Sequence, residues 1–372
     1  MPNQIDPVEL ASALIAVPSV TPATGAVFDL LEAALAPLGF AIHRFTRGEP
    51  AVENMGAIRG QGTPHFGFAG HLDVVPPGDG WSGDPFVPRI EEGRLIGRGA
   101  NDMKSAIAAF VAAVPQRQDK GTLSLLITGD EEGPGAHGTV AIIDWLEERA
   151  IKPDFILIGE PTSEARLGDT LKIGRRGSVN MWIDVPGTQG HVAYPHKADN
   201  PIPALARLVC ALEAIHLDDG NAAFPPSNLE FTEVAVGQSA ANVIPGSASA
   251  RLNIRFNNLQ RGPDLVRMVE ELAQREAPGA KVRALISGEA FLTPPGHLYD
   301  LVSAAIHQET GIEPTLSTGG GTSDGRFLIK LCPVVDFGLP NATMHKLDES
   351  AATEDIRQLA RIYARVIEQA FA

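Results

Sequence analysis

The stretch FGFAGHLDVVP at residues 66–76 carries a histidine and an aspartate two positions apart, His71 and Asp73. Apolar residues run directly into this pair, which indicates a buried strand that presents two polar side chains where it ends. In a strand these side chains face the same way. A metal-binding imidazole usually donates its second nitrogen proton to a carboxylate, so the spacing suits a metal ligand and an orienting acid. A solvated strand end or a core histidine is the plainer interpretation of the pair alone.

Further acidic side chains follow two other apolar runs. LLIT at 125–128 leads to GDEEG at 129–133, which contains Glu131 and Glu132, and FILI at 155–158 leads to GEP with Glu160. Each run predicts a buried strand that ends in carboxylates, a placement that calls for a positive partner such as a metal. The segment GRGANDMK at 97–104 places Asp102 at a loop-to-helix junction, where a plain helix N-cap is the alternative. Asp130 is interpreted as a solvated turn residue.

Two histidines and three carboxylates therefore fall in loops at strand ends. They are His71, Asp102, Glu132, Glu160 and His345. This mixture of nitrogen and oxygen donors suits two zinc ions held close together. Glu131 is the acid left over, and it is the candidate general base that takes a proton from the attacking water and passes it to a leaving amine.

Helices and strands alternate in the first part of the chain, which predicts a doubly wound α/β domain. The predicted helices cover residues 7–15, 26–38, 102–114 and 139–148, and the predicted strands cover 40–45, 54–58, 66–70, 123–128 and 155–158. In such sheets ligands bind beyond the carboxyl ends of the strands. The candidate metal ligands lie in that position.

From residue 177 the order of elements changes to βαββαβ, the ferredoxin-like arrangement. Strands are predicted at 179–185, 229–236, 248–256 and 282–286, with helices at 200–215 and 263–276. TPPG at 293–296 is a linker signal, and helices resume from 298. We therefore predict a catalytic domain made of residues 1–176 and 293–372, with a dimerisation and lid domain inserted at 177–292.

Composition is that of a globular protein without nucleic-acid partners. The 372 residues are 44% hydrophobic, enough for a sizeable core and two domains, and the net charge is -15 with acids and bases interspersed. Two cysteines exclude a disulfide framework and fit a reducing cytoplasm. Neither a signal peptide nor an 18-residue apolar span is evident, so no membrane association is expected.

Four motifs, in order along the chain, resemble the dinuclear zinc amidohydrolases that include aminoacylases, acetylornithine deacetylase and glutamate carboxypeptidases. They are GHLDVVP at 70–76, GRGANDMK at 97–104, DEEG at 130–133 and GEP at 159–161. The resemblance implies that His71 and Glu160 bind one zinc and that Glu132 and His345 bind the other. It further implies that Asp102 bridges them, that Asp73 orients His71 and that Glu131 is the base. The resemblance also implies that cobalt can replace zinc at one of the two sites.

Within this family, further segments resemble the branch that hydrolyses the amide of N-succinyl-LL-2,6-diaminopimelate, a step toward lysine and the cell wall. These segments are IGRRGS at 173–178, GHVAYPH at 190–196, NVIP at 242–245, residues 317–327 and NATMHK at 341–346. The resemblance implies a homodimer in which His191 reaches the oxyanion of the partner's active site. The implied substrate contacts are Arg175, Ser178, Tyr194, Asn242, Arg255, Thr322 and Asn341. The guanidinium group of arginine can donate two parallel hydrogen bonds to one carboxylate, which suits a substrate with several carboxylates.

Several alternatives stay open from the residues alone. Arg176 could be a surface charge, His196 a loop residue and Asn242 a strand-end cap. The sequence departs from the pattern in the loop at 133–137 and in the KLDE that follows His345. A sibling deacylase, such as acetylornithine deacetylase, is the nearest rival function. A metal-dependent binding module that has lost catalysis is the rival from another class.

Overall fold

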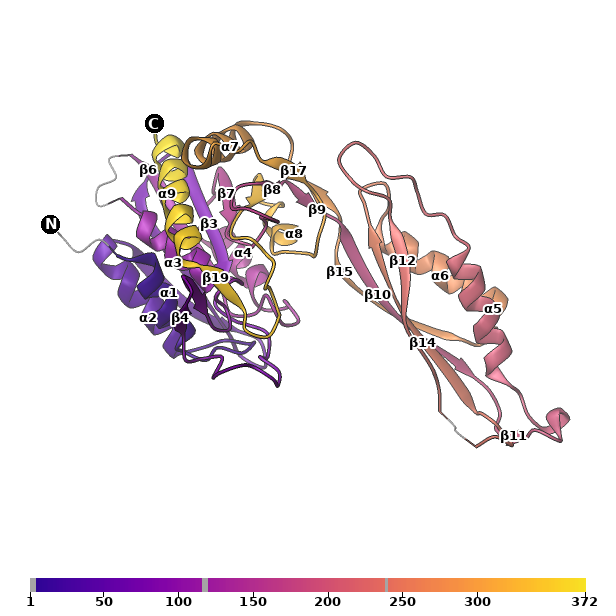
Figure 1. Ribbon diagram of the computed structural model, residues 1–372. Helices are drawn as coiled ribbons and strands as arrows, with labels where there is room; N and C mark the ends of the chain where they lie inside the picture. The colour runs from indigo at the N-terminus through magenta and orange to yellow at the C-terminus, as the bar shows by residue number, and fades with distance from the viewer. Residues whose placement is uncertain (1–4, 116–119, 238–239) are drawn as a thin grey trace. The chain divides into compact units, whose positions relative to one another are not determined.

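The computed structural model describes residues 5–115, 120–237 and 240–372, and the chain divides into two compact units (Figure 1). Unit 1 comprises Met1–Gly174, Thr293–Ser317 and Ser323–Ala372, and unit 2 comprises Arg175–Leu292 and Thr318–Thr322. The five-residue segment Thr318–Thr322 lies in the stretch that the sequence assigned to the first domain. It belongs with unit 2 because Thr318 donates a hydrogen bond to the carbonyl of Ala223 and Arg175 donates one to Gly321.

An eight-stranded mixed sheet forms the centre of unit 1, with the strand order β1-β2-β6-β3-β7-β18-β8-β17. In that order the strands are Ala41–Arg47, Val52–Gln61, Gly121–Thr128, His65–His71, Phe155–Ile158, Val334–Asp336, Thr170–Lys172 and Thr315–Ser317. β3 pairs in parallel with both β6 and β7, and β18 continues the parallel run beyond β7. The carboxyl ends of β3, β6 and β7 therefore meet at one edge of the sheet.

Helices cover both faces of this sheet, as the doubly wound pattern predicted. They are α1 (Pro7–Ile15), α2 (Ala26–Leu35), α3 (Lys104–Ala113), α4 (Thr139–Glu148), α7 (His297–Thr310), α8 (Gly325–Leu328) and α9 (Thr353–Ala370), with a 3-10 turn η1 at Ala36–Leu38. Alternate residues of the strands face opposite layers. Met55 and Ala57 of β2 join the main core with α3 and α9, whereas Gly56 between them faces Trp145 of α4.

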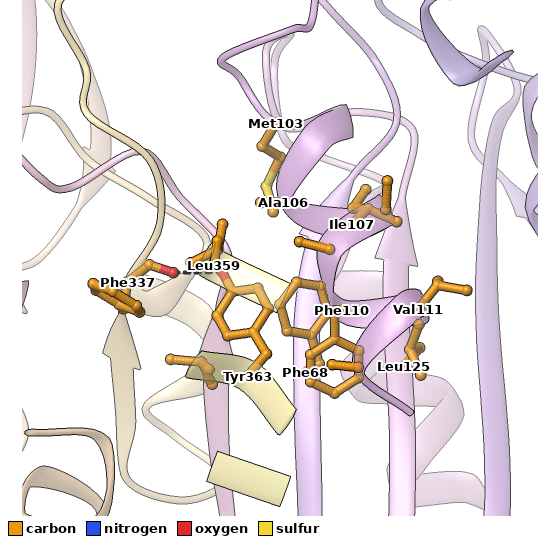
Figure 2. Packing of buried hydrophobic residues seen from close by; sticks show 14 of the residues in the cluster. Phe68, Met103, Ala106, Ile107, Phe110, Val111, Leu125, Phe337, Leu359 and Tyr363 are labelled. Atoms are coloured by element: carbon orange, nitrogen blue, oxygen red, sulfur yellow. Dashed lines mark hydrogen bonds between the residues drawn. The ribbon is translucent and has the colours of Figure 1, made fainter. Parts of the chain in front are cut away.

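Aromatic side chains from three elements hold the main core of unit 1 together (Figure 2). Phe110 of α3 stacks on Phe68 of β3 with 4.0 Å between ring centroids, and it meets Tyr363 of α9 edge-on at 5.7 Å. The buried hydroxyl of Tyr363 donates to the carbonyl of Phe337 at 2.7 Å. The packing fixes the strand that carries His71 against the helix that follows Asp102.

A small sheet that the sequence did not predict lies beside the main one. Its strands are β4 (Arg89–Glu91), β5 (Arg94–Ile96) and β19 (Ser350–Ala352), in the order β19-β5-β4. Ser350 pairs with Ile96, so the chain after residue 345 is brought next to the segment that leads to Asp102.

Unit 2 has the predicted βαββαβ order. Its antiparallel sheet runs β12-β14-β10-β15, with β10 at Gly177–Pro186, β12 at Asn228–Val236, β14 at Ser247–Phe256 and β15 at Lys281–Gly288. The helices α5 (Pro201–Glu213) and α6 (Gly262–Glu276) share a core with β10 and β14. Shorter elements are β9 (Gly174–Arg175), β11 (Gly190–His191), η2 (Pro195–Lys197), β13 (Val243–Ile244) and β16 (Phe291–Leu292). Across the described residues, no helix is both long and apolar enough to cross a membrane.

We expect Phe110→Ala to destabilise unit 1 by about 3 to 5 kcal/mol, because it removes a fully buried ring and leaves a cavity between Phe68 and Tyr363. Urea unfolding followed by aromatic fluorescence measures the change. Val87→Ala, at a side chain that is 61% exposed, is the control and should shift the midpoint little. Equal midpoints for Phe110→Ala and the control would contradict the assignment of this cluster as the core.

Candidate metal centre

The candidate ligands come together at the edge where three parallel strands end. His71 is the last residue of β3, Glu131 and Glu132 follow β6 after a short turn, and Glu160 follows β7. Because β3 lies between β6 and β7, the loops after these strands are neighbours. Asp102 arrives from the loop before α3, and His345 arrives from the loop before β19.

Asp102 lies between the two histidines and offers one carboxylate oxygen to each. Its Oδ1 is 3.1 Å from Nε2 of His71, and its Oδ2 is 3.2 Å from Nε2 of His345. Glu160 approaches the first histidine at 3.8 Å and Glu132 approaches the second at 2.9 Å. The structure thus brings all five expected ligands together, with an acid beside each imidazole and a third acid shared between them.

Glu131 also lies among these donors. Its carboxylate falls within 4.8 Å of donor atoms of His71 and Glu160, and a second group of the same compactness joins His71, Asp102 and Glu132. Proximity alone therefore allows Glu131 to be either a ligand or a base. The site is open on one side, because the side chain of His345 is 45% exposed whereas that of His71 is 1% exposed.

Asp73 contacts three of the functional residues at once. Its main-chain carbonyl oxygen is 2.9 Å from Nδ1 of His71, and its carboxylate Oδ1 is 3.5 Å from the same nitrogen. The two carboxylate oxygens also accept hydrogen bonds from the backbone N–H groups of Glu131 and Glu132, at 3.2 Å and 3.0 Å. Asp73 therefore fixes the His71 ring and the turn that carries the glutamate pair.

Two glycines in the motifs leave room for the side chain of Met103. A Cβ atom at Gly70 would lie 2.6 Å from the methyl carbon of Met103, and one at Gly159 would lie 2.7 Å from it. These glycines directly precede His71 and Glu160, while Met103 directly follows Asp102. Their missing side chains therefore let the Asp102 segment approach the ends of β3 and β7.

The electrostatics of the cluster show an excess of negative charge. Burial would lower the pKa of His71, but hydrogen bonds to Asp102 and Asp73 outweigh it and raise this pKa well above its ordinary value. Hydrogen bonds to Asp102 and Glu132 raise the pKa of His345 to about 10. Burial would raise the pKa of Asp102, but its hydrogen bonds to the two histidines outweigh it and lower this pKa. Protons on the imidazoles thus supply the positive charge that these acids require.

This donor set fits divalent metal ions. A metal ion competes with protons for the imidazole nitrogens. When bound, it would give the carboxylates the positive charge that protonated histidines otherwise provide. Carboxylates with two imidazoles suit zinc and related ions.

Glu131 has neighbours that the sequence did not identify. Desolvation raises its pKa to about 8, the carboxylates of Asp324 and Glu132 add to the rise, and His71 and Arg326 oppose it. Asp324 is buried and accepts a hydrogen bond from Thr139 at 2.6 Å. Both Asp324 and Arg326 belong to the segment at 317–327, which the resemblance singled out without assigning a role to either residue.

Four predicted substrate contacts lie near the start of β10 in unit 2. Ser178 is directly opposite Arg255 in the pairing of β10 with β14, and Arg175 donates to the carbonyl of Gly321, the residue before Thr322. Nearby Arg176 is half-buried and donates to Asn228 at 2.9 Å, so it is not a simple surface charge. Burial lowers the pKa of Arg255, and the charge of Arg176 adds to this effect.

The other predicted residues of unit 2 lie beyond the far end of β10. His191 is in β11, its Nδ1 accepts a hydrogen bond from the N–H of Ala193, and its ring is 5.7 Å from that of Tyr194. The carbonyl of Asn242 accepts from the N–H of Val192. All of His191, Tyr194 and Asn242 are exposed. Asn341 belongs to unit 1, four residues before His345, and its N–H donates to the carbonyl of Ser163.

Solved structures with low sequence identity share this fold. A tripeptidase from Staphylococcus aureus superposes with a TM-score of 0.82 at 16% identity, covering 99% of each chain. A metallo-carboxypeptidase of family M20 from Sulfolobus solfataricus gives 0.81 at 16% identity, covering 98% of this chain and 99% of that one. A Bacillus subtilis protein described as a dinuclear metal-binding peptidase gives 0.71 at 15%, covering 97% and 96%.

Curated relatives are similar over the whole chain. The succinyl-diaminopimelate desuccinylase of Sphingopyxis alaskensis is 62% identical over 376 residues, covering 100% of both chains. The enzymes of the same name from Zymomonas mobilis and Caulobacter vibrioides are 58% and 53% identical, each covering at least 97% of both chains. The family model for peptidase family M20/M25/M40 matches residues 67–369, which include every candidate ligand. The chain therefore belongs to peptidase family M20/M25/M40 and is a hydrolase.

Proposed function

We propose that this protein hydrolyses the amide of N-succinyl-LL-2,6-diaminopimelate to succinate and LL-2,6-diaminopimelate, with two zinc ions per subunit, in the cytoplasm. The observation that carries the proposal is the full-length similarity, at 62% identity, to a relative named for this activity. The convergence of His71, Asp102 and His345, with an acid beside each histidine, supports a dinuclear site. The two free cysteines are compatible with a reducing compartment.

Each metal is assigned the ligands that lie together in unit 1. His71 and Glu160 would hold one ion, Glu132 and His345 would hold the other, and Asp102 would serve both. When bound, such ions supply Lewis-acid polarisation of the amide carbonyl and lower the pKa of water. Cobalt at one of the two sites is part of this proposal.

Glu131 acts as the general base in this scheme. Its carboxylate takes a proton from the attacking water and delivers it to the amine that leaves. The raised pKa of Glu131, about 8, keeps a proton on it in the absence of metal. A nearby cation would favour the ionised carboxylate, which is the form of Glu131 that can accept a proton. Asp73 maintains the arrangement by holding the N–H groups of Glu131 and Glu132.

Arginine side chains are the proposed contacts for the carboxylates of the substrate. Arg175 and Arg255 lie at one end of the unit 2 sheet with Ser178, and Thr322 follows the glycine that Arg175 contacts. Guanidinium groups bind carboxylates through paired N–H donors. Asn341 is proposed to add a contact from unit 1. The double-arginine segment at 175–176 favours a succinyl group over the acetyl group of acetylornithine.

The layout of unit 2 supports a homodimer in which His191 acts on the partner's substrate. Ser178 is the second residue of β10 and Pro186 is the last, so at a rise of about 3.3 Å per residue roughly 26 Å of extended strand lies between them. The arginine group lies at the Ser178 end, and His191 follows Pro186 in β11. A small substrate does not span that distance, so the two groups of one chain would serve different active sites. β12 is an edge strand that exposes Val234 and Val236, which provides a surface for pairing.

The substrate assignment predicts that zinc-loaded protein releases amine from succinyl-diaminopimelate. Acetylornithine should be cleaved with a kcat/KM lower by roughly a hundredfold or more, because it lacks the distal carboxylate of the succinyl group. A chelator should abolish the activity and added zinc should restore it. Preference for acetylornithine would favour the sibling deacylase, and metal binding without turnover of either compound would favour a binding module.

The assignment of Glu131 predicts that Glu131→Gln lowers kcat by roughly 10² to 10⁴-fold while both zinc ions remain bound. Glu147→Gln, at an exposed residue of α4, is the control and should retain full activity. Metal analysis after gel filtration decides the role. Loss of one zinc from Glu131→Gln would reassign this residue as a ligand beside His71 and Glu160.

The shared active site predicts complementation between two inactive chains. When Glu131→Gln and His191→Ala chains are mixed and exchanged into heterodimers, one of the two sites has both groups intact. Activity should therefore rise well above that of either parent homodimer, up to about half of the wild-type value per dimer. Verified heterodimers without recovery would mean that His191 acts within its own chain.

A further inference from the structure

Glu349 is hydrogen-bonded to the segment that carries Asp102 and is not one of the expected metal ligands. Its side chain is fully buried. Oε1 accepts hydrogen bonds from the backbone N–H groups of Asn101 and Asp102 at 2.7 Å and 2.9 Å. Oε2 accepts from the guanidinium of Arg98 at 2.8 Å and from the N–H of Gly99 at 3.1 Å. All four donors belong to the segment 98–102 that delivers Asp102.

The backbone extends this connection. The N–H of Gly97 donates to the carbonyl of Glu349 at 2.9 Å, and strand β19 begins at the next residue and pairs with β5. Arg98 also donates to the carbonyls of Lys346 and Pro77, at 3.4 Å and 3.1 Å. The segment that carries Asp102 and the segment that carries His345 are therefore attached to each other through the buried Arg98–Glu349 ion pair and the backbone hydrogen bonds beside it.

The His345 segment needs such support because its backbone is strained. His345 has φ of +60° and Asp348 has φ of +51°, values that residues other than glycine rarely adopt. Such conformations persist where surrounding contacts hold them. Glu349 provides contacts on one side, and Asp348 provides others by accepting from Ser82 and Arg89.

We propose that Glu349 is a positioning residue that sets Asp102 relative to His345 and thereby fixes the affinity of the metal these two ligands share. This inference rests on the proposed dinuclear function. The ion held by His71 and Glu160 depends less on Glu349, because Asp102 is its only ligand that Glu349 positions, whereas the other ion depends on both Asp102 and His345. Loss of Glu349 should therefore weaken one metal selectively.

Glu349→Gln is the decisive variant. An amide has one acceptor oxygen and an NH₂ group, so some of the donors of segment 98–102 would face another donor instead of an acceptor. Zinc titration of the metal-free full-length protein, with a competing chelator, should show one ion bound with wild-type affinity. The second should bind about 10 to 100-fold more weakly. At subsaturating zinc kcat should fall while KM is unchanged, and excess zinc should restore part of it.

Two controls separate positioning from general destabilisation. Leu35→Ala lowers the stability of unit 1 at a buried residue of α2, an element that supplies no candidate ligand, and it should keep both zinc affinities. Glu354→Gln makes the same chemical change at an exposed acid in the first turn of α9, and it should also keep both affinities. If Glu349→Gln does not fold, Arg98→Lys is the alternative test. Lysine keeps the positive charge but lacks the planar guanidinium group with its paired N–H donors, so the affinity for the second zinc should fall several-fold.

The outcomes distinguish the inference from the proposed function. If folded Glu349→Gln binds both zinc ions with wild-type affinity, the inference is overturned and the hydrolase assignment stays intact. The same result in Arg98→Lys has this meaning if Glu349→Gln does not fold. Equal weakening of both zinc ions would overturn the selective role. A wild-type protein that binds no second zinc would instead contradict the dinuclear function itself.

Discussion

Repulsion between buried carboxylates is the constraint on which the structure of unit 1 depends. Asp73, Asp102, Glu160 and Glu349 are all buried near one sheet edge. Two like charges 4 Å apart repel by about 4 kcal/mol at an effective dielectric constant of 20, so these acids need compensation. Asp73 and Glu349 obtain it from backbone N–H donors, and Glu349 also from Arg98. Asp102 and Glu132 face imidazoles, where metal ions could supply positive charge.

Much of this arrangement could be predicted from the sequence, because the ligands follow apolar runs in an α/β pattern. Helix α4 and strand β7 have the predicted bounds, and the carboxylates after β6 and β7 lie beside His71 as expected. Strands β4, β5 and β19 could not be predicted. Each has three residues, and β5 is paired by a partner some 250 positions away in the chain. β19 therefore exists through tertiary pairing rather than through local propensity, whereas β4 and β5 form a local hairpin whose strands are too short to show an alternating pattern.

Glu349 shows a different limit of sequence reasoning. Its partners are mainly backbone N–H groups, which every residue except proline carries, so no residue type marks them. The segment Thr318–Thr322 illustrates the same limit. Its glycine-rich sequence gives no indication of which unit it joins. Its hydrogen bonds, from Thr318 to the carbonyl of Ala223 and from Arg175 to the carbonyl of Gly321, attach it to unit 2.

The room that Gly70 and Gly159 leave for the methyl group of Met103 has a consequence for the interpretation of genetic variants. Replacing either glycine by alanine changes no charge, no ligand and no φ in the positive region, and by substitution class it would be scored as mild. The added Cβ would nevertheless come within 2.6 to 2.7 Å of the methyl carbon of Met103, and at Gly159 also within 2.6 Å of the Phe68 ring, so these side chains would have to move. At these two positions, the volume of the side chain, rather than its chemical type, determines whether a variant is tolerated.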